Sequence, residues 1–236
     1  MIILLPPSEG KAEGGKPGTS WDPASGAFGP VLAGMRAEVA SSLKKAKGGD
    51  QKLLGVKGDV LARAQEENRS IVGSPVLPAW QRYTGVVWDH LDLASMYAAD
   101  RRTALRSILV PGGAMGLVRG DDPVPAYKLK MGASVPPMGK LSTWWRPAVT
   151  AAVEKAARGT EIVDLLPQEH AAAVEWSALS NVVHVELVAR AGGAVGGHFA
   201  KAAKGLLARW LLENADSGVS AAVKSFRNPD YAARIR

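Results

Sequence analysis

The sequence predicts one mixed α/β domain in which helices flank a mixed sheet, and three observations support this fold class. The 236 residues suit one large domain or two small ones, and a chain of this length buries a sizeable core. Short apolar runs, typical of buried strands, alternate with longer segments that have helical periodicity. No repeat, low-complexity tail or linker divides the chain. We therefore expect a single compact domain over residues 1–236.

Short apolar runs that end at turn residues are the predicted strands. The first run stops at Pro6-Pro7, and a later run stops at Pro111-Gly112. Parallel and sandwich strands that are buried on both faces give continuous apolar runs of this kind. The predicted strands are residues 1–5, 108–110, 162–166 and 182–188.

Apolar side chains at helical spacing mark the predicted helices. Gly48-Gly49 ends the first of these patterns. The predicted helices are residues 31–47, 60–68, 79–93, 141–157 and about 199–214. Residues 8–30 are rich in glycine, proline and serine and predict a long surface loop, a kind of segment that is often functional. The glycines of residues 192–197 predict a hairpin or loop before the last helix.

Composition excludes several classes of protein. The absence of cysteine excludes disulfides, thiolate nucleophiles, zinc fingers and cysteine-ligated clusters. The apolar start lacks the basic leader and cleavage site of a signal peptide, and no apolar run reaches the roughly 18 residues that span a membrane. The four histidines show no metal-binding spacing, so we expect no metal site, and no cofactor is indicated. We expect a cytoplasmic protein with no membrane partner.

The net charge of +7 is unevenly distributed along the chain. Residues 1–100 are neutral, residues 101–158 carry +7, residues 159–197 carry −4, and residues 198–236 carry +4. If the two positive segments meet in the fold, they form a basic surface suited to nucleic acid or a phosphorylated ligand. The alternative is a scattering of solvated lysines.

The last predicted helix has an apolar face and a cationic side. Projected at 100° per residue, its apolar positions share one broad face, whereas His198, Lys201, Lys204 and Arg209 lie opposite. Gly205 lies between the cationic positions, and a glycine within a helix costs about 1 kcal/mol relative to alanine. Either an anionic ligand approaches the helix there, or another helix or strand does. The apolar face comprises Phe199, Ala200, Ala203, Leu206, Leu207, Trp210 and Leu211.

The loop after the first strand is a second candidate site. Ligands in α/β proteins bind at the carboxyl ends of sheet strands. Ser8, Glu9 and Lys11 supply a hydroxyl, a carboxylate and an ammonium within four residues. These groups suit a nucleophile, a base and an anion holder, or else a turn with a surface ion pair. If the loop serves chemistry, we expect Glu9, Lys11, His198 and Lys201 to line one cleft.

Two glycine-containing segments are further candidates. Residues 111–116 follow a strand as a phosphate loop does, but the next residues cannot begin a helix, so neither a dinucleotide-binding fingerprint nor a P-loop is present. Residues 53–62 resemble a helix-hairpin-helix, which binds the DNA backbone through main-chain amides. Lys57 interrupts the usual pattern of two glycines around one apolar residue, so an ordinary interhelical turn is the alternative.

Five motifs stand in one order along the chain, namely IILLPPSEGK at 2–11, RYTGVVWDHLD at 82–92, PAYKLKMG at 125–132, LSTWW at 141–145 and HFAKAAKGLLARWLLEN at 198–214. Together they resemble the YaaA-like peroxide stress protein family, from Ile2 to about Tyr231. The resemblance implies a cytoplasmic protein that limits damage from hydrogen peroxide and is linked to low free iron. It also implies a single mixed fold, a positively charged cleft, a helix-hairpin-helix element within residues 31–68 and DNA-binding activity, with no established reaction.

Three functions follow from these observations. The first is a DNA-binding stress protein whose basic cleft contacts phosphates. The second is an enzyme that acts on a phosphorylated or carboxylated small molecule in the same cleft, and the third is a scaffold for an acidic partner. The predicted nucleic-acid or anion contacts are Lys57, Lys128, Lys130, Lys201, Lys204, Gly205 and Arg209. The residues predicted for an enzyme are Ser8, Glu9, Lys11, Tyr83, Asp89 and His198.

Overall fold

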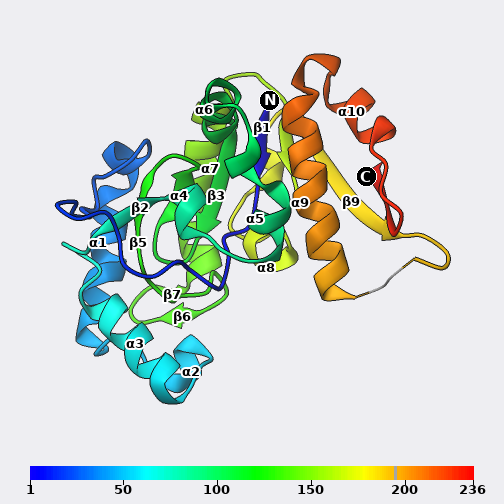
Figure 1. The fold of residues 1–236 in the computed structure, drawn as a ribbon. Coiled ribbons are helices and arrows are strands. Elements are labelled where there is room, and N and C mark those ends of the chain that lie inside the picture. The colour runs from blue at the N-terminus through cyan, green and yellow to red at the C-terminus, as the bar shows by residue number, and fades with distance from the viewer. Residues whose placement is uncertain (194–195) are drawn as a thin grey trace.

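A six-stranded sheet forms the centre of the protein (Figure 1). The computed structural model describes residues 1–193 and 196–236. The strand order is β10-β9-β8-β1-β3-β4, with the four inner strands parallel and the two edge strands antiparallel to their neighbours. The strands are β1 (Ile2–Leu4), β3 (Ile108–Gly112), β4 (Gly116–Arg119), β8 (Ile162–Asp164), β9 (Val182–Ala189) and β10 (Tyr231–Ile235).

The first strand lies in the middle of the core. Ile3 pairs with Ile108 on one side and with Val163 on the other. All three side chains are fully buried, because helices and loops cover both faces of this part of the sheet. The predicted strands at residues 1–5, 108–110, 162–166 and 182–188 are thus confirmed in type and place, as is the mixed α/β fold.

Helices surround the sheet. In Figure 1, α9 (Gly197–Glu213) passes in front of β9, and α5 (Val86–Leu91) lies beside α9. The helix α7 (Leu141–Ala157) packs against β4 and α1 (Gly29–Lys45). The other helices are α2 (Gln51–Leu54), α3 (Gly58–Arg69), α4 (Ala79–Arg82), α6 (Ala98–Ser107), α8 (Gln168–Ala171) and α10 (Val219–Ser225). None of the helices among the described residues is both long and apolar enough to cross a lipid bilayer.

Residues 111–116 form a hairpin between β3 and β4, so they are not a phosphate loop. Two further antiparallel pairs lie outside the main sheet. They are β2 (Val76–Pro78) with β5 (Pro123–Pro125), and β6 (Ser134–Val135) with β7 (Gly139–Lys140). Part of the predicted glycine loop, residues 194–195, lies outside the described residues.

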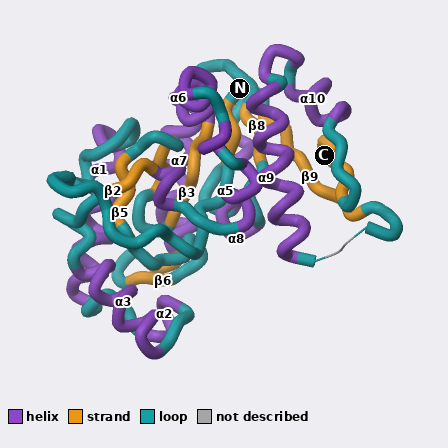
Figure 2. Tube along the Cα trace, in the orientation of Figure 1, coloured by secondary structure: helices purple, strands orange, loops and turns teal. Residues whose placement is uncertain are grey.

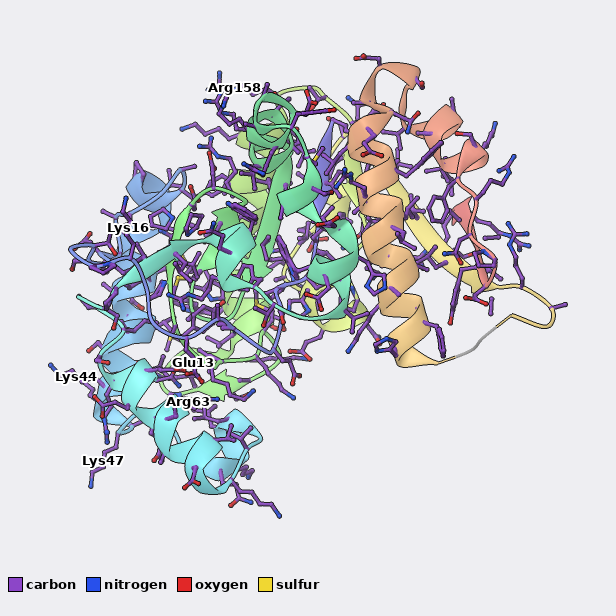
Figure 3. The ribbon with its side chains drawn as sticks, viewed as in Figure 1. Glu13, Lys16, Lys44, Lys47, Arg63 and Arg158 are labelled. Atoms are coloured by element: carbon purple, nitrogen blue, oxygen red, sulfur yellow. The ribbon has the colours of Figure 1, made fainter. Side chains whose placement is uncertain are left out.

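The long loop before α1, visible in Figure 2, is held by a buried arginine. Arg82 donates from Nη2 to the carbonyl of Gly14 over 2.8 Å, from Nε to the carbonyl of Val124 over 3.1 Å, and from Nη1 to the carbonyl of Ala12. Arg63 of α3 pairs with Glu13 of the same loop (Figure 3). The segment that carries Lys11 is therefore fixed to the domain by side chains distant in sequence.

The prediction of one helix over residues 79–93 is wrong. The chain breaks between α4 and α5, where Gly85 has a φ of 109° that a helix cannot contain. At the break, buried Tyr83 forms an isolated bridge with Lys11. The carbonyl of Arg82 accepts from the N–H of Ala12, and the N–H of Thr84 donates to the carbonyl of Gly10, so the loop that follows β1 takes the place of the next helical turn beside Tyr83.

The predicted apolar face of the last helix is also partly wrong. Phe199 and Leu206 are 45% and 41% exposed, whereas Gly205 and Ala208 are buried. The helix packs against α5 on one side and against β9 and β10 on another, so two contact faces replace the single broad one.

Candidate anion-binding cleft

The cleft lies where the loops that leave β1 and β8 diverge. These two strands are parallel neighbours. Along the chain, the sheet strand that follows β1 is β3, which pairs with the side of β1 that faces away from β8. The strand that follows β8 is β9, which pairs with the side of β8 that faces away from β1. A reversal of this kind leaves a crevice at the carboxyl ends of the two strands, and open α/β sheets bind ligands there.

Two adjoining cavities occupy this position. The larger has a volume of about 460 Å³, within the range of roughly 300–1,000 Å³ that is typical of ligand pockets. The smaller, of about 60 Å³, lies beside it and is lined by Lys11, Tyr127, Lys128 and Lys130. The larger cavity is lined by Thr84, Gly85, Lys201 and Lys204 among others. Both share Pro7, Ser8, Glu9, Glu169 and His170.

Lys11 is held above two buried tyrosines. Its Nζ donates to the carbonyl of Ser8 over 3.1 Å and lies 4.3 Å from the ring centre of Tyr127 and 5.7 Å from that of Tyr83. The two phenol oxygens lie 3.3 Å apart. Burial, helped by the charge of Lys128, lowers the pKa of Lys11 to about 7.

The tyrosines themselves are neutral. Burial raises the pKa of Tyr127 to about 12 and raises that of Tyr83 well above its ordinary value. Tyr83, predicted as an enzyme residue, is buried beside Lys11 and is not among the residues that line the two cavities.

Glu9 links the cations of the cleft. Its Oε1 lies 3.2 Å from Nζ of Lys130. Burial acts to raise the pKa of Glu9, but the hydrogen bond and charge of Lys130 and the charges of Lys128 and Lys201 hold it below the ordinary value. Glu9 is consequently ionised at neutral pH. The three lysines come from the two separate basic segments of the sequence, so the fold brings these segments together.

The loop after β8 supplies the opposite wall. Lys204 of α9 donates to the carbonyl of Leu165 over 2.5 Å, and burial lowers the pKa of Lys204 despite the nearby charge of Asp164. Burial also lowers the pKa of His170. The Nδ1 atom of His170 is buried and has no hydrogen-bond partner among the described residues. His170 therefore borders both cavities as a neutral imidazole whose unpaired Nδ1 is buried in the wall.

Comparison with known proteins identifies the family of this chain. A family model described as "Peroxide stress protein YaaA" matches residues 1–235. The chain belongs to this family. A UPF0246 protein of Streptomyces coelicolor is 34% identical over 98% of this chain and 91% of its own length. UPF0246 proteins of Corynebacterium glutamicum and of a Ruegeria species are 32% and 30% identical, over 89% and 77% of this chain and 84% and 75% of their own lengths.

In this YaaA-family chain, the predicted helix-hairpin-helix segment reaches the rim of the cleft. Asp50 caps α2, which has a single turn, and Gly55 ends it with a φ of 67°. A Cβ atom on Gly55 would lie 3.8 Å from Nζ of Lys130. Lys57, which is exposed, precedes α3 without a side-chain cap. The turn between α2 and α3 and the cavities therefore border one surface.

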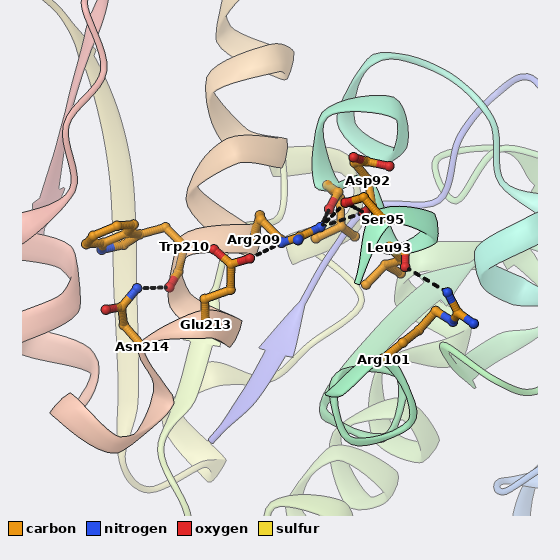
Figure 4. Close-up of polar contacts among 9 residues, drawn as sticks. Asp92, Leu93, Ser95, Arg101, Arg209, Trp210, Glu213 and Asn214 are labelled. Atoms are coloured by element: carbon orange, nitrogen blue, oxygen red, sulfur yellow. Dashed lines mark hydrogen bonds and ion pairs between the residues drawn. The ribbon is translucent and has the colours of Figure 1, made fainter. Parts of the chain in front are cut away.

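Arg209 lies elsewhere and is engaged in structural contacts (Figure 4). Its Nε donates to Glu213 over 2.5 Å, and its Nη1 donates to the carbonyl of Asp92 over 2.5 Å and to Oγ of Ser95 over 3.0 Å. It lines a separate cavity of about 520 Å³ together with Met1, at the amino end of β1. Its guanidinium fixes the segment after α5 to α9, and Arg209, predicted as a phosphate contact, does not line either cavity of the cleft.

Helix packing explains Gly205. A Cβ atom there would lie 2.3 Å from the carbonyl oxygen of Val87 and 2.8 Å from Cβ of His90. The glycine therefore permits α5 and α9 to touch, and the buried position is not open to a ligand. Of the two explanations for Gly205, approach of an anionic ligand or of another helix or strand, the structure therefore shows the approach of another helix, α5.

Two other predicted residues lie outside the two cavities. His198 is exposed at the start of α9, with its ring 5.9 Å from that of Phe199. Asp89 is exposed and borders a different cavity, of about 370 Å³, with Trp80 and Trp88. Glu9 and Lys201 do line the larger cavity, and Lys11 lines the smaller one.

Glu169 and His170 were not among the predicted site residues. They follow β8, as Ser8 and Glu9 follow β1, and this position after a predicted strand was the available signal. Within the described part of the chain, no group of three or more histidine, aspartate or glutamate side chains is placed to hold a metal ion.

Proposed function

We propose that this YaaA-family protein is a DNA-binding peroxide stress protein that contacts backbone phosphates through the basic cleft. The observation that carries this proposal is the electrostatic neighbourhood of Glu9. Lys128, Lys130 and Lys201, from the two basic segments, all act on this one carboxylate. Lys128, Lys130, Lys201 and Lys204 line the two cavities against the carboxylates of Glu9 and Glu169, so the cleft has a surplus of positive charge that attracts phosphate.

The exposure of these lysines suits phosphate contacts. Lys130 is 45% exposed at its side chain despite the contact with Glu9, and Lys201 is also exposed. An exposed ion pair of this kind contributes little to stability, so a phosphate can replace Glu9 as the partner at little cost. Phosphate contacts by flexible lysines position the protein on DNA without reading its sequence.

The turn between α2 and α3 extends the same surface. The first N–H groups of a helix lack intrahelical partners and favour anions. The start of α3 adds such groups beside Lys57, and Gly55 brings the turn next to Lys130. A helix-hairpin-helix contact to one phosphate therefore continues the row of lysines beyond the cavities.

Salt dependence tests the proposal. We expect binding to unrelated duplexes with similar affinity, and a logarithmic affinity that falls by about 0.9 per contacted phosphate for each log unit of salt. Fluorescence anisotropy across a salt series measures both quantities. An affinity that is insensitive to salt, or no binding near physiological salt, would contradict the proposal.

A second candidate function is an enzyme that acts on a phosphorylated or carboxylated small molecule in the cytoplasm. The cavity of about 460 Å³ favours it, because this volume accommodates a small ligand or a single nucleotide and not the width of a duplex. The two candidates share one cleft, and a ligand screen with thermal melting distinguishes a free small molecule from DNA.

A further inference from the structure

We propose that Lys11 is a nucleophile that forms an imine with an aldehyde that carries a phosphate group. Two sources offer this chemistry, namely the ring-opened sugar of an abasic site in DNA and a free sugar phosphate. The abasic source rests on the proposed DNA binding, whereas the free sugar phosphate does not. Neither requires a metal or a bound cofactor.

The position of Lys11 supports this role. Its Nζ has one hydrogen bond, to the carbonyl of Ser8, and otherwise faces the rings of Tyr83 and Tyr127. No carboxylate of the described residues lies within ion-pair distance of this nitrogen. Burial and the charge of Lys128 outweigh the more distant charges of Glu67 and Glu9, so the ammonium form of Lys11 is disfavoured and the neutral amine is favoured.

The protonation state follows from the same surroundings. With its pKa lowered to about 7, roughly half of the Lys11 side chains are neutral at pH 7, whereas only one in a few thousand ordinary lysines is. Only the neutral amine has a lone pair for attack on a carbonyl carbon. Lysines activated by desolvation and a neighbouring cation are the usual imine-forming residues of enzymes.

The two cavities divide the ligand between them. The smaller cavity of about 60 Å³ is bordered by Lys11 and has room for a small group such as the aldehyde. The adjoining cavity of about 460 Å³ has room for the sugar and phosphate, with Lys201 and Lys204 in its wall. Lys128 and Lys130 border the smaller cavity and add positive charge at the junction.

The reaction balances without a further reagent. The lone pair of Lys11 Nζ forms a C–N bond, and the carbonyl π electrons move to the oxygen. A proton then passes from nitrogen to that oxygen and gives a carbinolamine. Uptake of one proton and departure of the hydroxyl as water leave a protonated imine. The imidazole of His170, whose pKa is lowered by burial, lies in the wall that the two cavities share and is near enough to Lys11 to feel its charge, so we assign the relay of these protons to it.

Borohydride trapping tests this inference. The wild-type protein is incubated with a duplex that contains one abasic site, with the matched intact duplex, or with deoxyribose 5-phosphate, each in the presence of sodium cyanoborohydride. The reagent reduces an imine to a stable secondary amine. We expect adducts with the two aldehydes and none with the intact duplex, and peptide mass spectrometry should locate them at Lys11.

Two variants control the chemistry. Lys11→Arg should lose the adduct, whereas Lys16→Arg, a change at an exposed lysine of the same loop (Figure 3), should retain it. The rate of adduct formation should rise with pH to a midpoint near 7, because half of the Lys11 side chains are neutral there. For a surface lysine, the rate would continue to rise toward pH 10.

The outcomes separate this inference from the proposed function. An adduct at Lys11 with the free sugar phosphate alone supports the imine and rejects the abasic site as its source. Anisotropy with the intact duplex tests DNA binding independently of any adduct. No adduct at Lys11 with either aldehyde, or adducts spread over surface lysines, would overturn the inference even where DNA binding holds.

Discussion

Gly205 of α9 meets the backbone of Val87 in α5 so closely that a Cβ atom would lie 2.3 Å from the carbonyl oxygen of Val87. The two helices therefore touch through their backbones. Because backbone cannot move aside as a flexible side chain can, Gly205→Ala should destabilise the protein by about 1–3 kcal/mol. Urea denaturation of the variant measures this loss.

Gly34 provides the matched control for that substitution. It is also within a helix, α1, but an added Cβ would have no neighbour within 4 Å. Gly34→Ala should therefore stabilise the protein by about 0.5–1 kcal/mol through helix propensity. Equal effects of the two substitutions would show that the contact between α5 and α9 is looser than described.

Arg209→Ala should destabilise the protein with little effect on DNA affinity. The substitution removes the hydrogen bonds to Asp92, Ser95 and Glu213 that fix the segment after α5. A hydrogen bond that involves a charged group contributes about 1.5–3 kcal/mol to stability. The contribution of each bond of Arg209 should be smaller, because the bonds to the carbonyl of Asp92 and to Oγ of Ser95 are exposed to solvent. Thermal melting and anisotropy of the same sample separate the two effects. A stable variant with weakened DNA binding would return Arg209 to the phosphate contacts.

Replacement of Lys11 should change how stability depends on pH. The pKa of Lys11 is about 7 in the folded protein and near 10.5 in the unfolded chain, so the unfolded chain binds more protons between these values. The contribution of Lys11 to stability therefore rises with pH across this window. Lys11→Met removes this rise because methionine carries no proton. The variant should therefore be more stable than the wild type, and by the largest margin below pH 7.

Denaturation at pH 6 and pH 9 measures that difference. The advantage of Lys11→Met over the wild type should shrink by about 1–2 kcal/mol from pH 6 to pH 9, less than the full pKa difference implies because Lys11 is only half-buried. An advantage that does not depend on pH would mean that Lys11 is solvated and has an ordinary pKa.

The sequence predicted the sheet better than the surface of the helices. The runs that became β1, β3, β8 and β9 are apolar because helices cover both sides of the sheet, and such runs are visible without knowledge of the fold. The edge strand β10 was not predicted, because its five residues include an arginine and are partly exposed. The break at Gly85 was missed because it depends on the distant bridge between Lys11 and Tyr83.

The candidate site was only partly accessible to sequence reasoning. Ser8, Glu9 and Lys11 could be named because they follow the first predicted strand. The partner of Glu9 is Lys130, which is 121 positions away, and nothing in the local sequence of either residue indicates that contact. The lowered pKa of Lys11 likewise depends on burial and on the charge of Lys128, from a distant segment of the chain, so only the folded chain reveals it.

The most direct test of the central claim, that the cleft binds phosphate, compares two lysine substitutions that change the net charge equally. Lys201 lines the cavity, whereas Lys155 is exposed near the end of α7, just before β8 begins, and so at the opposite end of the sheet. The salt dependence of duplex binding is measured for the wild type, Lys201→Ala and Lys155→Ala. We predict that Lys201→Ala alone weakens binding and reduces the salt slope by about 0.9, one phosphate contact. Equal losses for both variants, or a salt slope unchanged in Lys201→Ala, would contradict a phosphate-binding cleft.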